Sequence, residues 1–396
     1  MSTSLAVVLF LAAALATAYV LFLYPLGLAL LAKWRPKPVF KRWDPRAVSV
    51  IIPVRNGERW VRQKLESVLA LDYPMNLLEV LVVSDGSTDG TEEIVRSFSA
   101  QGVRLLTVPA GGKPAALNAA FPLVQGELLL LTDVRQTLRA DCLKRLVSCM
   151  ADPSVGVVSG NLLIRRGNTE EEESTGLYWR YESWIRRNLG TVDSLLGATG
   201  PIYLVRRSLV KPIPPDQLLD DVYLPLCIHL EGYRLVLEEE AIAFDEPTEL
   251  RSEFRRKVRT QAGVLQMLWT FPGLFRSANR MRFHFLSLKV GRLALPCLLL
   301  ALLLSALALP GPWRWVLGGP QLLAYALALA DPWMPPGSPG KRITAPLRAF
   351  VVLVAAALWA FSILVVPARS LWTETRAAAP RSRQAGGSEN GSRFMR

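Results

Sequence analysis

The feature that most constrains the fold of this chain is an uncharged apolar run from Leu5 to Leu31. A helix needs about 20 such residues to cross the hydrocarbon core of a membrane. A cleaved signal peptide fits less well, because its apolar region is usually about 7–15 residues long and follows a basic segment. We therefore expect residues 1–34 to form an N-terminal transmembrane helix that stays attached to the chain.

Three further apolar stretches lie towards the other end of the chain, at Leu293–Leu309, Trp315–Ala330 and Ala349–Val366. We expect residues 293–368 to hold the C-terminal transmembrane helices, although the middle stretch is short for a full crossing. Four crossings in total would place the remaining tail, residues 369–396, outside, whereas its arginines favour the inside. A re-entrant or interfacial middle stretch would remove this conflict. We expect the tail to be flexible.

The distribution of charge predicts how the chain is oriented. The net charge is +13, and basic residues cluster just after the first apolar run and just before the second. Basic flanks favour the cytoplasmic side, so we expect a multi-pass protein of the plasma membrane with Lys33–Arg292 in the cytosol. Nucleic acid is not an expected partner, because the cations stand beside membrane segments and no nucleic-acid-binding motif accompanies them.

The four cysteines and two histidines favour neither a structural zinc site nor a disulfide framework. The cysteines form no C-x-x-C pair and no cluster with either histidine, whereas both kinds of site need such spacing. Any chemistry must therefore come from other side chains.

The segment between the apolar runs alternates β-branched stretches with amphipathic ones, which predicts an α/β domain. The fourth stretch is apolar throughout, as in a strand that is covered on both faces of a parallel sheet. We expect an open, doubly wound sheet that binds its ligands beyond the carboxyl ends of the strands. The expected strands are Val48–Pro53, Leu78–Val83, Val103–Val108 and Glu127–Thr132.

Acidic residues stand at the ends of two of these strands and at the start of a later helix. Asp85 follows the second strand, Asp133 follows the fourth, and the pair Asp220-Asp221 opens a helix that runs from Val222. Each carboxylate alone has a structural explanation, because aspartate caps helices and complements the helix dipole. Three acidic positions of this kind in one domain favour a shared ligand site.

Three pieces of sequence follow one another in a characteristic order: Val48–Pro53, then Glu79–Thr91 with its Ser-Asp-Gly-Ser-Thr-Asp-Gly segment, then Gly112-Lys-Pro-Ala-Ala-Leu-Asn118. In this order they resemble the family 2 glycosyltransferases with a GT-A fold, particularly the membrane-embedded branch of polysaccharide synthases and polyprenyl-phosphate glycosyltransferases. The resemblance implies a Rossmann-like nucleotide-sugar-binding domain over residues 45–250, flanked by transmembrane helices.

The resemblance also implies an activity. The expected enzyme is an inverting hexosyltransferase that moves a sugar from a nucleotide-sugar donor, a UDP-sugar in the first instance, to a hydroxyl of a membrane-associated glycan or lipid-linked acceptor. Membrane lipids, the donor and a lipid-linked or polysaccharide acceptor are the expected partners. Two alternatives stay open: a polyprenyl-phosphate sugar transferase, and a non-catalytic membrane scaffold that keeps the fold.

The family motifs assign donor-binding roles to several residues of this chain. Pro53, Arg55 and Glu58 match the first nucleotide-binding loop, and Asp85 matches the aspartate that hydrogen-bonds the base. Lys113 matches the lysine near the donor phosphates. Glu58 could instead be a solvated charge at a helix start, Lys113 a solvated loop lysine, and Asn118 a structural residue.

The D-x-D motif of the family is incomplete in this chain. Asp133 matches its first aspartate and is the expected metal ligand, but Arg135 stands in the position of the second. Because arginine does not bind metals, a Mg²⁺ or Mn²⁺ ion would need phosphate oxygens and water for most of its coordination shell. Alternatively, Arg135 pairs with the diphosphate and replaces part of the role of the metal, or it points to solvent.

The acceptor side and the catalytic base are assigned by the same resemblance. Gly197 and Gly200 match a glycine-containing acceptor loop, although an ordinary turn before a strand explains them nearly as well. Asp220 and Asp221 match the T-E-D motif, in which Asp221 takes the place of the catalytic base. In the degraded Q-x-x-R-W element, Arg259 is expected near the diphosphate.

The last position of that element, which is a tryptophan in the family, is Thr260. The loss of the tryptophan weakens the comparison with processive synthases. Residues 251–292 interleave cations with apolar side chains, which is typical of helices that lie on a membrane surface. A pair of helices that closes the domain and exposes a basic face is the alternative.

Overall fold

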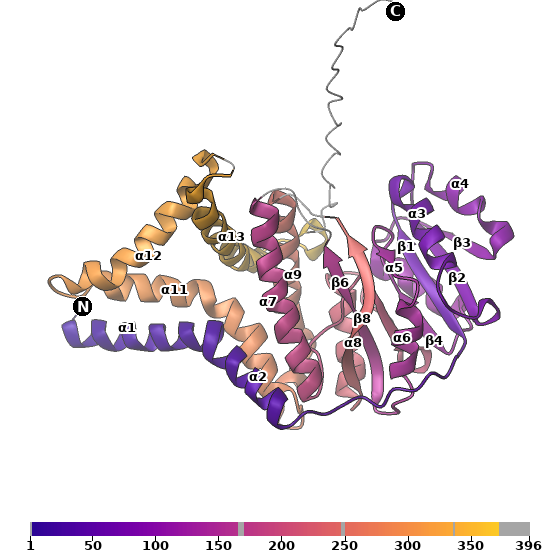
Figure 1. The fold of residues 1–396 in the computed structure, drawn as a ribbon, viewed down its shortest axis with the longest axis horizontal. Coiled ribbons are helices and arrows are strands. Elements are labelled where there is room, and N and C mark those ends of the chain that lie inside the picture. The colour runs from indigo at the N-terminus through magenta and orange to yellow at the C-terminus, as the bar shows by residue number, and fades with distance from the viewer. Residues whose placement is uncertain (1, 165–169, 247–249, 336, 372–396) are drawn as a thin grey trace, which may run out of the picture.

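The computed structural model describes residues 2–164, 170–246, 250–335 and 337–371. The chain forms an α/β domain at one end, and apolar helices project from it at the other (Figure 1). The expected flexible tail lies almost wholly outside the described residues.

One eight-stranded sheet forms the centre of the α/β domain, in the order β3-β2-β1-β4-β7-β6-β8-β5. The first four strands in this order are parallel, as the sequence predicts, because each is followed by a helix that returns the chain to the same edge. The strands are β1 (Val48–Val54), β2 (Leu78–Asp85), β3 (Val103–Val108), β4 (Leu128–Leu131), β5 (Thr137–Leu138), β6 (Val155–Ile164), β7 (Tyr203–Arg206) and β8 (Arg234–Asp245).

The second half of the sheet differs from the expected doubly wound arrangement. Strand β7 is antiparallel to both β4 and β6, and the short β5 is antiparallel to β8. The sheet is therefore mixed. The sequence analysis predicted direction only for the four parallel strands, because the apolar periodicity of a strand does not show in which direction the strand pairs.

Helices cover both faces of the sheet. Successive residues of β1 point to opposite faces, so Val50 and Ile52 pack into one core and Ile51 into the other. The first core is closed by α3 (Glu58–Leu69), α4 (Thr91–Arg96) and α6 (Cys142–Cys149). The second is closed by α5 (Lys113–Ala120), α7 (Glu170–Val192) and α8 (Asp220–Leu230).

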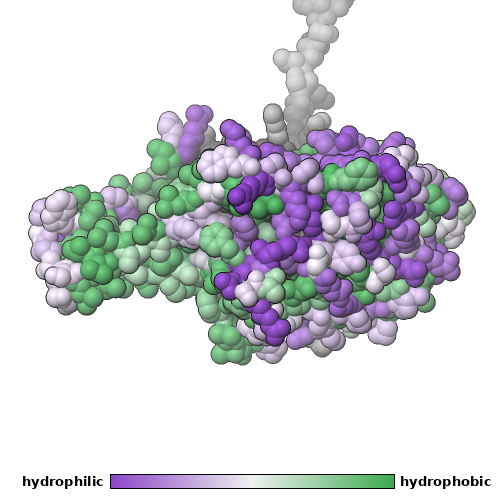
Figure 2. Space-filling model, turned by 90° about the horizontal axis from the view of Figure 1, so that it is seen from below, coloured by the Kyte–Doolittle hydropathy of each residue, from purple (hydrophilic) through white to green (hydrophobic). Residues whose placement is uncertain are grey.

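The described residues contain three helical segments that are long and apolar enough to cross a membrane: Thr3–Trp34, Arg282–Leu307 and Pro339–Leu364. The first comprises α1 (Thr3–Ala18) and α2 (Tyr24–Trp34), joined by a π-helical turn. Helix α1 lies along α11 (Gly291–Leu307) in Figure 1. The projecting end of the molecule carries the apolar surface seen in Figure 2.

Helix α12 (Trp313–Ala330) is not one of the three candidate spans within the described residues. It packs between α11 and α13 (Pro339–Trp359). By length and composition, the described residues therefore hold three candidate crossings rather than four, and whether the middle stretch is re-entrant or interfacial stays a prediction.

Helix α9 (Leu250–Thr270) connects the sheet to the C-terminal helices, followed by the short α10 (Arg282–Phe285). Ala262, Val264 and Leu265 of α9 are buried, and α9 contacts α13. Basic residues on another part of the helix line the cavity described below. Helix α9 thus closes the domain over its functional cavity.

Candidate active site

A cavity of about 480 Å³ lies where the carboxyl ends of β1, β4 and β8 meet α8 and α9. It is the position at which open α/β sheets bind ligands. Ten of the residues singled out in the sequence line it, from segments that are far apart in the chain: Pro53, Arg55, Lys113, Asp133, Arg135, Gly197, Gly200, Asp220, Asp221 and Arg259.

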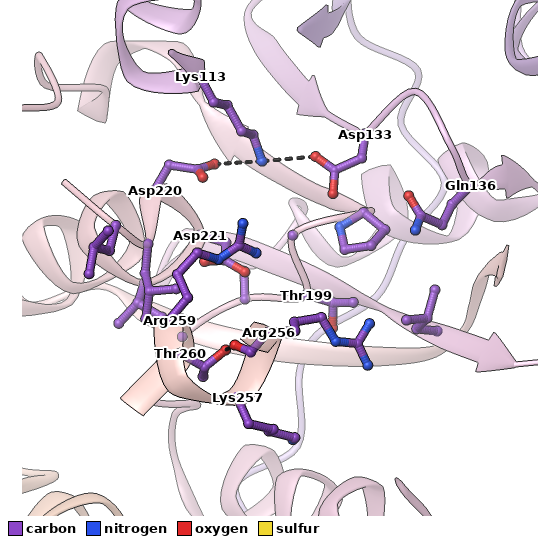
Figure 3. Close-up of a pocket in the computed structure, with 18 of the residues that line it drawn as sticks. Lys113, Asp133, Gln136, Thr199, Asp220, Asp221, Arg256, Lys257, Arg259 and Thr260 are labelled. Atoms are coloured by element: carbon purple, nitrogen blue, oxygen red, sulfur yellow. Dashed lines mark hydrogen bonds and ion pairs between the residues drawn. The ribbon is translucent and has the colours of Figure 1, made fainter. Parts of the chain in front are cut away.

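Lys113 joins two of the acidic positions (Figure 3). Its Nζ lies 2.8 Å from Oδ1 of Asp133 and 2.9 Å from Oδ2 of Asp220. Burial opposes a charge on the lysine, but the neighbouring carboxylates outweigh it and hold the pKa of Lys113 above its ordinary value. Likewise Lys113 overcomes the effect of burial on Asp133 and lowers the pKa of that carboxyl. Both groups are therefore charged at neutral pH.

Lys113 is positioned by the turn that precedes it. Gly112, the residue before α5, has a φ of +86°, which a residue with a side chain rarely adopts. The turn places Lys113 in the first turn of α5, where its side chain reaches across to the end of β4 (Figure 3). The sequence segment Gly-Lys-Pro thus encodes both the turn and the cation.

Asp221 lies beside this ion-pair cluster, at the start of α8 (Figure 3). Burial and the adjacent Asp220 raise the pKa of Asp221 to about 6, although Lys113 and Arg259 act in the opposite direction. A carboxyl group of this kind can accept a proton near neutral pH, as a general base must.

The loop that contains Gly197 and Gly200, which we call the glycine loop, contacts Asp221. The backbone N–H of Ala198 donates to the backbone carbonyl of Asp221 over 2.8 Å. A side-chain carbon on Gly200 would lie 2.8 Å from Oδ2 of Asp221, which is closer than such atoms approach. Gly200 therefore gives the carboxylate room, so the ordinary-turn explanation of this glycine is insufficient.

Arg135 forms an ion pair with Asp245, with 2.5 Å between Nη2 and Oδ2. The amide of Gln136 donates to the same oxygen over 2.9 Å. These contacts arise because β5 pairs with the end of β8 and carries the preceding residues to Asp245. Arg135 therefore does not simply point to solvent. The sequence analysis missed Asp245, although its place at the end of a strand was a usable signal.

Lys64 of α3 forms hydrogen bonds with both ends of the loop that carries Asp133 and Arg135. Its side chain is fully buried, and Nζ donates to Oγ1 of Thr132 and to the carbonyl of Gln136, both at 2.6 Å. Burial lowers the pKa of Lys64 to about 7, although Asp133 counteracts this. The lysine bridges the two ends of the loop that carries Asp133 and Arg135, and the helical pattern of α3 gave no indication of this role.

Glu58 and Asp85 are not among the residues that line the cavity. Asp85 is 4% exposed, and its carboxylate accepts hydrogen bonds from the backbone N–H groups of Gly111 and Gly112. Glu58 accepts from the backbone N–H of Gly90 over 3.1 Å. Both residues hold together loops at the carboxyl edge of the sheet, so the base-binding role of Asp85 stays a prediction.

Asn118 and Thr260 have contacts within their own part of the fold. The side chain of Asn118 makes hydrogen bonds with both the backbone N–H and the carbonyl of Ile213, in agreement with a structural role. Thr260 lines the cavity and donates to the carbonyl of Arg256 one helical turn earlier.

The described residues contain no group of three or more histidine, cysteine, aspartate or glutamate side chains that could hold a metal ion. Oδ1 of Asp133 already contacts Lys113, and Asp245 is engaged by Arg135. These residues do not fit a metal ion that the protein binds by itself.

A second group of charged residues also lines the cavity, and we call the part that they line the membrane-side end, because two of its members lie in a candidate span. Its members are Glu182, Arg186, Arg256, Lys257, Lys289 and Arg292. In Figure 3, Arg256 and Lys257 lie on the other side of Asp221 from Lys113. Lys289 and Arg292 belong to the candidate span Arg282–Leu307. The sequence analysis read these two only as basic residues flanking a membrane helix.

Comparison with known proteins agrees with this architecture. The profile described as Glycosyl transferase family 2 matches residues 49–213. A probable glycosyltransferase of Bacillus subtilis, YdaM, is 29% identical over 262 residues, which cover 60% of each chain. A beta-monoglucosyldiacylglycerol synthase of Nostoc is 23% identical over 202 residues, which cover 47% of this chain and 42% of the relative. The chain thus spans about half the length of these relatives.

A solved structure supports the fold over nearly the whole chain. The mannosyltransferase PcManGT from Pyrobaculum calidifontis, in complex with GDP-Man and Mn²⁺, superposes with a TM-score of 0.67 and 24% sequence identity. The match covers 89% of this chain and 99% of that structure. PcManGT has the GT-A fold. Because the match covers most of this chain, the similarity in fold includes the helices that flank the sheet as well as the sheet itself.

Proposed function

Because residues 49–213 of this chain match the family 2 glycosyltransferase profile, we propose that the protein is a glycosyltransferase of this family and transfers a sugar from a nucleotide-sugar donor to a membrane-associated acceptor. The observation that carries the proposal is the meeting of Lys113, Asp133 and Asp221 in one cavity. A cation for phosphate and a carboxylate of raised pKa are the two groups that this transfer requires.

The proposed reaction inverts the configuration of the sugar. The acceptor hydroxyl oxygen bonds to the anomeric carbon while the bond from that carbon to the diphosphate breaks. The nucleoside diphosphate leaves with the electron pair, and the hydroxyl proton passes to the carboxylate of Asp221. General-base catalysis of this kind contributes about 10²–10⁴-fold to a rate.

Cations at the sheet end of the cavity would stabilise the leaving group. Lys113 exchanges part of its contact with Asp133 and Asp220 for the diphosphate, and Arg259 lies near the same carboxylates. Fixed charges that face developing negative charge are usually the largest catalytic contribution. Arg55 and Pro53, which also line the cavity, complete the donor side.

A divalent cation is proposed as part of the donor complex rather than as a resident group. Asp133 would be its protein ligand, and diphosphate oxygens and water would fill the remaining positions of Mg²⁺ or Mn²⁺. When bound, the ion would neutralise charge on the diphosphate. Arg135, held by Asp245, stands close to that position as a fixed positive charge.

The three candidate spans support a multi-pass membrane protein. We place the sheet domain in the cytosol, where nucleotide sugars are made available, and the membrane in contact with α11. The acceptor then reaches the cavity from the membrane, past the charged residues of the membrane-side end. A scaffold without activity would not need a base beside phosphate-binding cations.

The test compares the wild type with Asp221→Asn in detergent, using UDP-sugars and GDP-sugars with and without Mg²⁺. We expect the variant to bind nucleotide with unchanged affinity in calorimetry and to lose at least about 100-fold in transfer rate, the lower range of general-base catalysis. Normal turnover of the variant would contradict the assignment of the base and favour a phosphate acceptor, which needs none. A wild type that binds no nucleotide at millimolar concentration would contradict the enzyme itself.

A further inference from the structure

Two cations of the membrane-side end face the cavity without a carboxylate at ion-pair distance among the described residues. Arg186 of α7 donates from Nη2 to Oγ of Ser159 over 3.0 Å and to Oγ1 of Thr199 over 2.9 Å. The side chain of Lys289, in the π-helical turn Leu286–Val290, has no hydrogen bond or ion pair with the described part of the chain. A partly buried cation with only neutral partners is costly unless an anion joins it.

The carboxylate close to these two cations belongs to Glu182, which already forms an ion pair with another residue. Glu182 pairs with Arg292 at the start of α11, and both side chains are about four-fifths buried, with 19% and 20% exposed. Glu182 acts on Lys289 only as a charge in the vicinity. Glu182 acts in the same way on Arg186, so one carboxylate that is already paired with Arg292 is the shared neighbouring charge of both cations, and neither has a carboxylate at ion-pair distance within the described chain.

Both cations lie on the acceptor side of the proposed base. Thr199, the partner of Arg186, precedes Gly200, whose Cα faces the carboxylate of Asp221. Asp221 interacts electrostatically with Arg186 and with Lys289. An anion held by these two cations would lie next to the reacting hydroxyl and apart from Lys113, which serves the donor diphosphate at the other end.

The position of Lys289 indicates where such an anion comes from. Lys289 lies in the π-helical turn Leu286–Val290, inside the candidate membrane span Arg282–Leu307. Leu288 and Val264 line the cavity beside the cations. A ligand with a lipid tail in the membrane and an anionic group at this depth satisfies both the apolar and the basic parts of the lining.

We propose that Arg186 and Lys289 bind a phosphate group of the lipid acceptor, so that the substrate of this enzyme is a phosphate-bearing lipid rather than an uncharged glycolipid. The inference rests on the proposed function, because it names the acceptor of the same cavity. Arginine and lysine together suit phosphate, since the guanidinium binds two oxygens and the ammonium adds a compact charge.

The experiment measures transfer from the donor to three acceptors in the same detergent: a polyprenyl phosphate, a polyprenyl diphosphate sugar and an uncharged glucosyl diacylglycerol. We expect one or both phosphate-bearing lipids to be used and the uncharged lipid to be poor. Activity with the monophosphate that survives Asp221→Asn would identify the phosphate oxygen as the nucleophile, whereas activity with the diphosphate sugar that is lost in this variant would identify a sugar hydroxyl. Either result supports the phosphate site.

The variant Lys289→Met keeps the length of the side chain and removes its charge. We expect it to raise the KM for the phosphate-bearing lipid by about 10- to 100-fold, the usual effect of losing a charge-assisted hydrogen bond. Nucleotide affinity should not change. Arg186→Met should act in the same way, and Arg186→Lys should recover part of the loss, which a merely structural role would not predict.

Arg276→Gln is the matched control, because Arg276 is exposed and does not line the cavity. This control shows whether the rise in KM in Lys289→Met only reflects a weaker attraction of the whole protein to anionic lipid. Equal use of the uncharged lipid, together with an unchanged KM in Lys289→Met, would overturn the phosphate site while leaving the transferase intact. An absence of nucleotide binding and of nucleoside diphosphate release with every acceptor would instead overturn the proposed function.

Discussion

At the scale of single residues, the site is a set of charges whose states depend on one another. Lys113 stabilises the charged form of Asp133, whereas Asp220 disfavours a charge on Asp221. Lys64 adds a buried amine under the loop that carries Asp133. The result is a charged carboxylate at Asp133 and a carboxylate at Asp221 that is ready to take up a proton.

The raised pKa of Asp221 predicts the pH dependence of the reaction. A base works in its deprotonated form, so the transfer rate should fall by about tenfold per pH unit below about 6. The decline should be measured as nucleoside diphosphate release between pH 4.5 and 8, within the range where the fold is intact. A midpoint near the ordinary aspartate value would contradict the environment described for Asp221.

The raised pKa of Asp221 also affects the stability of the folded protein. Since the folded-state pKa lies above the unfolded value of 3.8, folding favours the protonated form, and the charged form lowers stability as the pH rises through about 6. Asp221→Asn removes the carboxylate charge and therefore this loss of stability. Its melting temperature at neutral pH should therefore equal or exceed that of the wild type, which separates lost catalysis from lost folding.

At the scale of elements, loops that join distant strands and helices fix the position of the chemistry. The loop with Gly197 and Gly200 precedes β7 and lies against the first turn of α8, where Asp221 stands. The loop after β4 is held by Lys64 at one side and by Asp245 of β8 at the other. A change in either loop would displace a charged group without touching the core.

Gly200→Ala tests the close approach of the glycine loop to the base. The added carbon would lie 2.8 Å from Oδ2 of Asp221, so either the carboxylate or the loop must move. We expect a fall in kcat of about 100-fold, as for a misplacement of about 1 Å, and little change in nucleotide affinity. Single-turnover kinetics and calorimetry measure the two effects.

Gly190→Ala provides the matched control on α7. There the nearest atoms to an added carbon are 3.5 Å away, which is ordinary contact. Alanine also favours a helix over glycine by about 1 kcal/mol. The control should retain activity and melt at an equal or higher temperature, and an equal loss in both variants would show that the effect of Gly200→Ala is not specific to the base.

A second prediction at this scale concerns the corner between α12 and α13. Asp331 is fully buried there; its carboxylate contacts Nζ of Lys341 at 2.9 Å and Nη1 of Arg348 at 3.1 Å, and accepts from Thr344. Removing one partner of a buried ion pair costs about 3–5 kcal/mol. Asp331→Asn should therefore lower the melting temperature in detergent, whereas Asp216→Asn, at an exposed position, should not.

At the scale of the whole molecule, the chain joins a sheet domain with a largely polar surface to helices with a largely apolar surface. The projecting helices expose large apolar side chains over most of their length (Figure 2). If all three candidate spans cross a membrane, the segments before the first span and after the third lie on opposite sides of it. With the sheet domain inside, as proposed, we predict that the chain after the third span is inside as well, as its arginines favour.

Cysteine labelling in intact cells tests this arrangement. A cysteine at Ser99, on the sheet domain, should react with an impermeant reagent only after the cells are opened. One at Trp313, the first residue of α12, should react from outside. Three of the four native cysteines are buried, and the variant Cys297→Ser removes the fourth as background. Labelling of both positions from the same side would contradict the three-span topology.

The sequence by itself determined the features that depend on neighbouring residues. Apolar runs located the candidate membrane segments, residue periodicity located the four parallel strands, and acidic residues at a strand end and at a helix start singled out Asp133 and Asp221. Lys113 was found through the resemblance to family 2 glycosyltransferases. These patterns are local, because helix and strand periods and turn preferences involve residues a few positions apart.

Only the tertiary structure decided which distant groups meet. The antiparallel half of the sheet brings Asp245 to Arg135, and the packing of α7 and of the π-helical turn before α11 around the cavity brings Arg186 and Lys289 near Asp221. Nothing in the local sequence of these residues specifies their partners, because the pairing follows from strand direction and helix packing across more than a hundred residues. The donor side of the cavity could therefore be predicted from sequence, whereas its membrane-side end required the fold.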